Sequence, residues 1–176
     1  MDHDFEIVRG LLDEAHCDLL IMRGLKVAPR PLPDRLPMPH RVSGDFLEVM
    51  KLPKIVEIVR ERLGDCDGLG SDFFYHPPGV DGMARHVDNT YVQAPPESFL
   101  SVWIALTDVN KENGCLYAEE PIELNKGDAV LIGQQLPHCS LPNNSDGCRF
   151  ALLLTYLKHG ATFRPGNTQK RTRVPL

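Results

Sequence analysis

Residues 126–140, KGDAVLIGQQLPHCS, contain the pattern that decides the fold. Lys126-Gly127-Asp128 is a turn signal, an apolar strand is predicted over 128–133, and a second short strand over 136–140. Segments of roughly five to nine residues alternate with turns in this way from residue 66 onward. Many short strands with turns between them are typical of a sandwich or a barrel.

Further strands are predicted on both sides of this stretch. They cover residues 71–76, 83–88, 99–107, 115–118 and 148–157. Turn signals separate them, among them Pro77-Pro78-Gly79, Asn113-Gly114 and Asp146-Gly147. The expected fold class is mainly β, with a double-stranded β-helix core (jelly roll, cupin-like) and N-terminal helices packed on it.

The N-terminal third has a different pattern. Residues 4–23 place apolar side chains at helical spacing and are followed by Gly24, which is expected to end the helix. A second helical region is predicted from 45 to 63, where Pro53 restarts it and Gly64 ends it. The prolines of residues 25–44 predict an irregular, extended segment. The 176 residues are expected to form one domain with a helical and Pro-rich region (1–65), a jelly-roll core (66–158) and a tail (159–176).

Composition argues against several other classes of protein. The chain is 42% hydrophobic and 24% charged, without an apolar run near the length of a membrane span, so no membrane partner is expected. A formal charge of −5 argues against nucleic acid as a partner. Five cysteines without a CxxC pair, and an acidic N-terminus without an apolar leader, favour a cytoplasmic protein with reduced thiols. The basic tail residues Lys170, Arg171 and Arg173 are expected to be solvated.

The most informative polar stretch is Met83-Ala84-Arg85-His86-Val87-Asp88-Asn89. On a strand, residues i and i+2 project to the same face, so His86 and Asp88 would converge on one metal ion. The pair alone is weak evidence, because chance predicts about half of one His-x-Asp match in a chain of this composition. A second match, His16-Cys17-Asp18, lies in the predicted first helix, where i and i+2 point apart, and we assign it to the helix surface.

A metal site needs a third ligand, and a second histidine would suit it. Two histidines and one carboxylate form the facial triad that holds non-haem Fe(II) and leaves coordination positions open. Of the remaining histidines, only His138 lies among the predicted strands late in the core, within residues 136–140. Arg149 opens the apolar run 150–154, and a buried guanidinium there needs an anionic partner. A dicarboxylic acid that chelates the iron would supply one.

The order of these motifs resembles the phytanoyl-CoA dioxygenase-like family of Fe(II)/2-oxoglutarate oxygenases. The likeness covers residues 51–156, beginning with Leu52-Pro53-Lys54-Ile55-Val56 and Pro77-Pro78-Gly79 ahead of the stretch from His86 to Asn89. It continues through Trp103-Ile104-Ala105-Leu106-Thr107-Asp108-Val109, Glu112-Asn113-Gly114-Cys115-Leu116, Gly127-Asp128, His138-Cys139-Ser140, Asn143, Ser145 and Arg149. The sequence from Arg85 to Asn89 is also similar, more weakly, to that of prolyl hydroxylases of the same superfamily.

The resemblance implies the ligands and co-substrates of the site. Iron, as Fe(II), would be bound by His86, Asp88 and His138, with 2-oxoglutarate and O2 as co-substrates. Arg149 would pair with the distal carboxylate of 2-oxoglutarate with help from Ser140, and Trp103 would pack against it. Tyr75 matches a prolyl-hydroxylase-like position that hydrogen-bonds the same carboxylate. For the substrate itself, contacts are expected from Tyr91, Arg85 and Arg41.

The implied reaction is hydroxylation of an aliphatic C–H bond in a small molecule, with decarboxylation of 2-oxoglutarate to succinate. The carboxylate of Asp88 favours hydroxylation over halogenation, because a small residue at that position would open a halide site. The sequence departs from the family after Tyr117, where residues 117–121 run almost directly into Asn125 and trim one wall of the usual substrate pocket. Two alternatives stay open: a peptidyl or prolyl hydroxylase, if residues 25–44 form an ordered flap, and a non-catalytic jelly roll that binds metal or 2-oxoglutarate.

Overall fold

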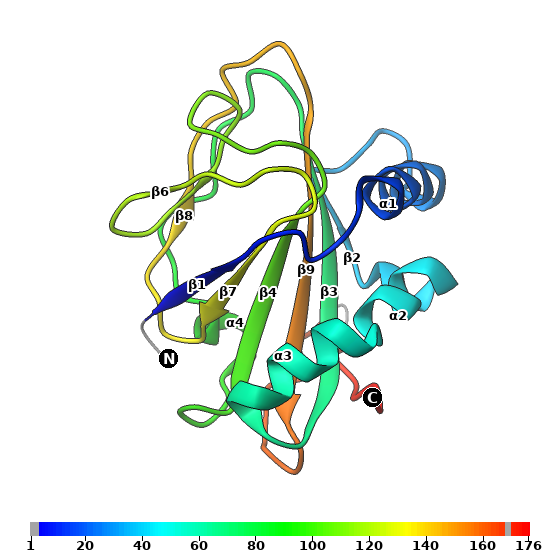
Figure 1. Cartoon of the computed structure of the whole chain (residues 1–176), viewed down its shortest axis with the longest axis vertical. Helices are drawn as coiled ribbons and strands as arrows, with labels where there is room; N and C mark the ends of the chain where they lie inside the picture. The colour runs from blue at the N-terminus through cyan, green and yellow to red at the C-terminus, as the bar shows by residue number, and fades with distance from the viewer. Residues whose placement is uncertain (1–3, 168–169) are drawn as a thin grey trace.

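Two antiparallel sheets form the framework of the computed structural model, which describes residues 4–167 and 170–176. Within these residues the larger sheet has the strand order β1-β7-β4-β9-β3-β2 and the smaller sheet the order β6-β5-β8 (Figure 1). The larger sheet consists of β1 Phe5–Val8, β2 Arg35–Pro37, β3 Cys66–His76, β4 Phe99–Ala105, β7 Ala129–Gly133 and β9 Arg149–Lys158. The smaller sheet consists of β5 Leu116–Tyr117, β6 Pro121–Ile122 and β8 Cys139–Ser140. The mainly β class predicted from the sequence is confirmed.

The larger sheet is buried on both faces, because successive residues of its central strands enter two different apolar clusters. On β4, Leu100, Val102 and Ile104 pack into the cluster beneath the helices. Trp103 and Ala105 of the same strand pack into the cluster beneath the smaller sheet. This two-residue period means that the odd-numbered positions of β4 face the space between the two sheets. Burial on both faces also explains why these strands read as continuous apolar runs.

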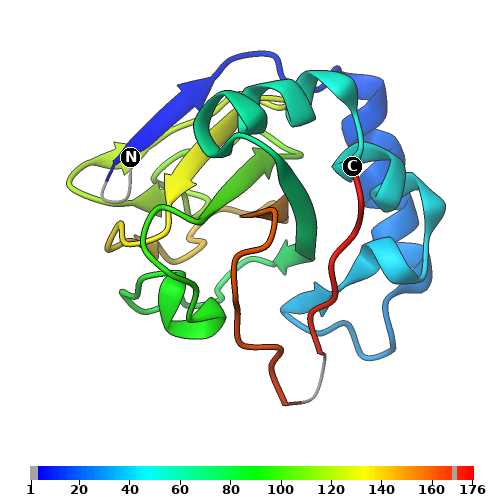
Figure 2. The ribbon, with the colours of Figure 1, turned by 90° about the horizontal axis from the view of Figure 1, so that it is seen from below.

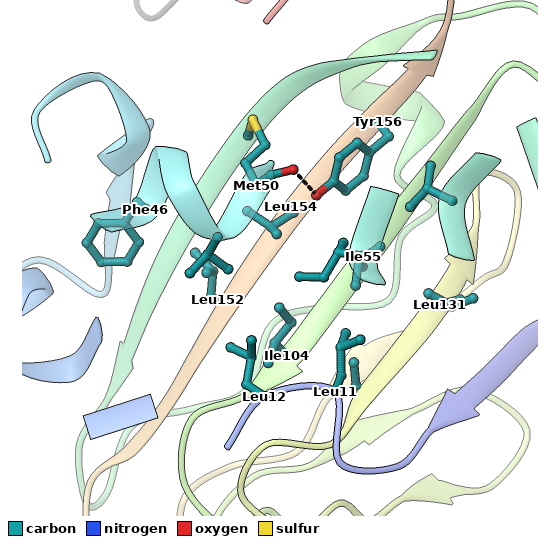
Figure 3. Packing of buried hydrophobic residues seen from close by; sticks show 14 of the residues in the cluster. Leu11, Leu12, Phe46, Met50, Ile55, Ile104, Leu131, Leu152, Leu154 and Tyr156 are labelled. Carbon is teal, nitrogen blue, oxygen red and sulfur yellow. Dashed lines mark hydrogen bonds between the residues drawn. The ribbon is translucent and has the colours of Figure 1, made fainter. Parts of the chain in front are cut away.

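Three helices cover the outer face of the larger sheet: α1 Glu14–Val27, α2 Gly44–Met50 and α3 Pro53–Leu63 (Figure 1). Pro53 occupies the start of α3 and Gly64 follows its end with φ +72°, as the sequence predicts. Figure 3 shows Met50 and Ile55 beside Leu154 and Tyr156 of β9. The buried hydroxyl of Tyr156 donates a hydrogen bond of 2.9 Å to the carbonyl of Met50, which ties α2 to the sheet.

The prediction of one helix over residues 4–23 is wrong at both ends. Residues 5–8 form β1, which pairs with β7 as an edge strand of the larger sheet, so sheet completion overrides the local helical pattern. Helix α1 begins only after Asp13, whose side chain accepts the N–H of His16 at 2.8 Å. Gly24 does not end the helix; a Cβ there would lie 2.6 Å from the ring of Phe73, so glycine permits close packing of α1 on the sheet.

Residues 25–44 are ordered along the edge of the sheet. They contain β2, which pairs with β3, and the short 3₁₀ helix η1 Pro39–Arg41. The region 1–65 therefore supplies two strands to the larger sheet in addition to its helices. Among the described residues, no helix is both long and apolar enough to cross a membrane.

Candidate metal centre

A cavity of about 530 Å³ lies between the inner face of the larger sheet and the smaller sheet. One wall is formed by alternate residues of β3, namely Asp72, Phe74 and His76. The opposite wall includes Leu116 of β5 and Ser140 of β8. The strand period that separates the two apolar clusters thus also decides which side chains enter the cavity.

His86, Asp88 and His138 meet at this cavity, and they form a group whose potential ligand atoms all lie within 4.8 Å of one another. The backbones of His86 and His138 pair in an antiparallel bridge, in which each N–H donates to the other's carbonyl at 2.9 Å. Their Nε2 atoms lie 3.5 Å and 3.7 Å, respectively, from Oδ1 of Asp88. Two imidazoles and one buried carboxylate aimed at a common point are the donor set of a non-haem iron site.

Hydrogen bonds orient each of these three side chains. Nδ1 of His86 is 2.9 Å from the carbonyl of Ala84, and Nδ1 of His138 is 3.0 Å from the carbonyl of Leu136. Because a carbonyl can only accept, each Nδ1 carries a proton and the Nε2 lone pair is left for a metal. Oδ2 of Asp88 accepts from the hydroxyl of Ser101 at 2.6 Å, which leaves Oδ1 facing the histidines.

The surroundings favour the metal-binding protonation states of two of the ligands. Burial would raise the pKa of Asp88, but the hydrogen bonds from His86 and Ser101 and the charges of the histidines outweigh it and lower that pKa. Burial lowers the pKa of His138. For His86, burial is outweighed by Asp88 and the carbonyl of Ala84, so its pKa is raised, and a bound cation would compete with its proton.

The prediction of a strand over residues 83–88 is wrong, although His86 and Asp88 do converge. Asp88 has helical dihedral angles (φ −61°, ψ −30°) and precedes the short helix α4 Asn89–Val92. The side chain of Asn89 stabilises this turn by accepting the N–H of Ala94 at 2.8 Å and donating to its carbonyl at 3.1 Å. Asp88 is therefore turned towards the histidines by the start of a helix rather than by strand alternation.

Arg149 lies at one end of the cavity, where the side chain of His76 is its hydrogen-bond partner among the described residues. It is 3% exposed, and its Nη2 donates to Nδ1 of His76 at 3.1 Å. The guanidinium carbon lies 5.4 Å from the ring centre of Trp103. Its Nε has no hydrogen-bond partner within the described residues, and burial lowers its pKa to about 10. A buried cation without a carboxylate in ion-pair contact, as judged from the described part of the chain, is suited to an anionic ligand.

Ser101 and His76 were missed by sequence reasoning. His76 directly precedes the turn at Pro77-Pro78-Gly79, and the register places it directly opposite Arg149 on β9. Ser101 was one position of a predicted strand and carried no motif. The period of β4 was a usable signal, since Ser101 is two residues before Trp103 and shares its face.

Three further predicted residues also lie at the cavity. Trp103 and Ser140 line it, and the hydroxyl of Ser140 accepts the N–H of Met83 at 2.7 Å. Tyr91 of α4 lines it as well, with its ring centre 5.6 Å from that of His86.

The other three predicted residues are not brought to the cavity. Tyr75 points to the opposite face of β3, where its ring packs 5.4 Å from that of Phe150. Arg85 donates to the carbonyl of Ala118 at 3.1 Å. Arg41 donates to the carbonyl of Lys170 at 2.6 Å and to the hydroxyl of Thr172 at 3.1 Å. The arginines that do line the cavity beside Arg149 are Arg35 and Arg171.

Comparison with known proteins places this site in context. The family model described as phytanoyl-CoA dioxygenase (PhyH) matches residues 34–118. The chain is 30% identical over 118 residues to phytanoyl-CoA dioxygenase 1 of Oryza sativa subsp. japonica, covering 48% of this chain and 42% of that protein. The chain is similar to the phytanoyl-CoA dioxygenase family. The resemblance predicted from the sequence is thereby confirmed, and the chain spans about half the length of the curated relatives that it matches.

Two solved structures with the same fold are described as alpha ketoglutarate dependent enzymes. The non-heme alpha ketoglutarate dependent carbocyclase SnoK from nogalamycin biosynthesis superposes with a TM-score of 0.82 at 20% identity, covering 95% of this chain and 84% of SnoK. The epimerase SnoN, solved in complex with Fe3+, alpha ketoglutarate and nogalamycin RO, gives a TM-score of 0.79 at 17% identity, covering 99% and 91%. The likeness confirms the predicted jelly-roll fold.

Proposed function

We propose that this chain is a non-haem iron, 2-oxoglutarate-dependent oxygenase that hydroxylates an aliphatic C–H bond of a small molecule. The observation that carries the proposal is the convergence of His86, Asp88 and His138 in the same cavity as the buried cation Arg149. The family resemblance supports the chemistry, and the small molecule bound in the SnoN complex supports the substrate class. The five free cysteines support a cytoplasmic location.

The residues present fit the implied metal and co-substrate. His86 and His138 would bind Fe(II) through Nε2, and Asp88 through Oδ1, since the remaining polar atoms of all three are already hydrogen-bonded. Arg149 would pair with the distal carboxylate of 2-oxoglutarate, and its stacking on Trp103 would restrict the position of the guanidinium. Bound iron and 2-oxoglutarate supply the oxidising chemistry, in which O2 is consumed, 2-oxoglutarate loses CO2 to give succinate, and a C–H bond becomes C–OH.

The chain itself contributes orientation and exclusion of water. Ser101 holds one oxygen of Asp88 so that the other stays directed at the metal position. Apolar side chains of the cavity wall, including Phe74, Leu116 and Leu153, keep water from the reacting centre. This arrangement favours reaction with a bound C–H bond over unproductive side reactions.

Succinate release tests the proposal. The protein loaded with Fe(II) is incubated with 2-oxoglutarate and O2, with and without candidate small molecules, and succinate is quantified. We expect turnover that His138→Ala abolishes and that Arg149→Ala reduces through a higher KM for 2-oxoglutarate. Binding of metal and 2-oxoglutarate without succinate under any of these conditions would instead support the non-catalytic alternative.

A further inference from the structure

The cavity has two polar ends, and only one of them is needed for 2-oxoglutarate. His76, with Arg149, stands at one end, and Asp72 lies four residues earlier on the same face of β3. A strand advances by about 3.3 Å per residue, so the two positions are roughly 13 Å apart. The metal ligands lie at the same cavity, next to Ser101 of β4. The end marked by Asp72 is therefore left for the substrate.

Two arginines from distant parts of the chain line this second end. Arg35 comes from β2, and its Nε lies 3.5 Å from Oδ1 of Asp72. Arg171 comes from the C-terminal tail, and its Nη1 donates to the carbonyls of Tyr91 (3.1 Å) and Arg164 (3.4 Å). Within the described residues, no carboxylate lies at ion-pair distance from Arg171.

The tail that carries Arg171 is fixed to the body of the protein on both sides of this residue. Arg41 donates to Lys170 and Thr172, and Arg173 forms an ion pair of 2.5 Å with Asp67. Val174 pairs with Gly68 in an antiparallel bridge. Figure 2 shows this segment (red) returning across the molecule to end on the side of the helices. Arg171 is therefore held as part of the cavity wall.

The charges at this end favour an anion. Burial lowers the pKa of Arg171; the charges of Asp72 and Asp88 oppose this effect, while those of Arg35 and Arg164 add to it. Burial raises the pKa of Asp72 to about 6 despite both arginines, and even when ionised this one carboxylate balances only one of the two arginine charges. Asp34 also lines the cavity but is exposed at its rim. A ligand oxyanion would provide Arg171 with the charged acceptor that the described protein residues do not.

We propose that Arg171 and Arg35 form a second anion site, which binds an acidic group (a carboxylate, phosphate or phosphonate) of the primary substrate while Arg149 holds 2-oxoglutarate. Arg171 donates a hydrogen bond to the carbonyl of Tyr91, which lies three residues after Asp88 in the chain. An acidic group bound there would place the rest of the substrate along the cavity, towards the metal. This inference rests on the proposed function and specifies the substrate class that it requires.

Binding of small probe molecules tests this site. The protein is loaded with Zn(II) and saturated with 2-oxoglutarate, so that the Arg149 end is filled and no turnover occurs. Phenylacetate, phenylphosphonate, benzyl alcohol and benzylamine are then titrated by calorimetry. We expect the two oxyanions to bind more tightly than the alcohol and the amine. Their affinity should fall at least tenfold in Arg171→Gln and should be largely retained in Arg171→Lys. Lys170→Ala, one residue away on the same tail, is the matched control and should bind as the wild type does.

The readouts separate this inference from the proposed function. Failure of the wild type to bind Zn(II) and 2-oxoglutarate would contradict the proposed function itself. With that binding intact, three results would overturn the second anion site: no oxyanion binding, equal binding of the alcohol or the amine, or unchanged oxyanion affinity in Arg171→Gln. Arg171→Gln must also keep the thermal stability and 2-oxoglutarate affinity of the wild type; a fall in both would assign Arg171 a structural role instead.

Discussion

Asp88 presents one oxygen to the metal position because Ser101 holds the other at 2.6 Å. Without that hydrogen bond the carboxylate would gain rotational freedom and lose part of the stabilisation of its charged form. We predict that Ser101→Ala weakens metal affinity by roughly 10- to 100-fold, the usual effect of removing a residue that orients a metal ligand. Competition with a fluorescent chelator measures this change. Ser145→Ala, at a position that does not line the cavity, is the control, and equal affinities for the two variants would contradict the role given to Ser101.

His76 gives Arg149 its hydrogen-bond acceptor, and burial followed by the charge of Arg149 lowers the pKa of this histidine below its ordinary value. We predict that His76→Phe raises the KM for 2-oxoglutarate by roughly tenfold with little change in kcat, since a hydrogen bond to a charged group contributes about 1.5–3 kcal/mol. Because protonation removes the acceptor, wild-type affinity for 2-oxoglutarate should fall in acid, and this acid dependence should be weaker in His76→Phe. A pH profile of 2-oxoglutarate binding that is identical in both proteins would argue against the assignment.

The candidate site could be predicted from the sequence only where single residue types carry the chemistry. His86, Asp88, His138 and Arg149 are identified by type and order, and the structure brings all four to one cavity. The geometry assumed for the first two was wrong, because nothing in His-x-Asp distinguishes a strand from the start of a short helix. Ser101, His76 and Arg171 required strand register or the path of the tail. These depend on contacts between residues far apart in the chain, which a single sequence does not display.

At the scale of elements, the close packing of α1 on the larger sheet requires glycine at position 24. An alanine at position 24 would place its Cβ 2.6 Å from the ring of Phe73, which is itself enclosed between Phe46 and Phe150. We predict that Gly24→Ala destabilises the protein by about 1–2 kcal/mol, because overpacking outweighs the helix propensity gained. Gly44→Ala at the start of α2 meets nothing within 4 Å and should be neutral or slightly stabilising. Urea denaturation compares the two, and equal stability of the variants would contradict the packing explanation.

The η1 turn contains a buried histidine that makes stability depend on pH. Nδ1 of His40 is 2.6 Å from the hydroxyl of Ser71, its Nε2 has no partner within the described residues, and burial lowers its pKa to about 4. The unfolded chain, with an ordinary pKa near 6.5, then binds more protons than the folded one between these values. Stability is therefore complete above pH 6.5 and is lost as the pH falls towards 4, by about 2 kcal/mol between pH 7 and pH 5.

Comparison with a variant isolates this effect of His40. The raised pKa of Asp72 acts in the opposite direction, since stability linked to it is lost as the pH rises towards 6. Urea midpoints of the wild type and of His40→Gln should therefore be compared at pH 7 and pH 5. We expect the difference between the two proteins to shift in favour of His40→Gln at the lower pH. A difference that does not change with pH would show that His40 is not neutral in the folded state.

At the scale of the whole molecule, the larger sheet separates a structural side from a chemical side. Its outer face packs on α1, α2 and α3, and its inner face, with the smaller sheet, encloses the cavity. The sequence predicted the class of fold because the strands and turns of residues 99–158 are locally distinct. It did not predict β1 and β2, because edge strands acquire their conformation from the strands beside them. The basic residues of the tail were expected to be solvated; Lys170 is exposed, but Arg171 lines the cavity and Arg173 pairs with Asp67, contacts that no local pattern shows.

Ligands that bind this cavity should stabilise the whole chain in two separable steps. A ligand present at about 100 times its Kd adds about 2.7 kcal/mol to the stability of the folded state. For a chain of this length we expect each of Zn(II) and 2-oxoglutarate to raise Tm by roughly 5–10 °C. His138→Ala should lose both increments, because in the proposed site 2-oxoglutarate would bind through the metal. Arg149→Ala should keep the Zn(II) increment and lose most of the second, because the distal carboxylate would lack its partner. Thermal scans with and without EDTA measure both steps, and an Arg149→Ala protein that retains the full second increment would place the 2-oxoglutarate carboxylate elsewhere.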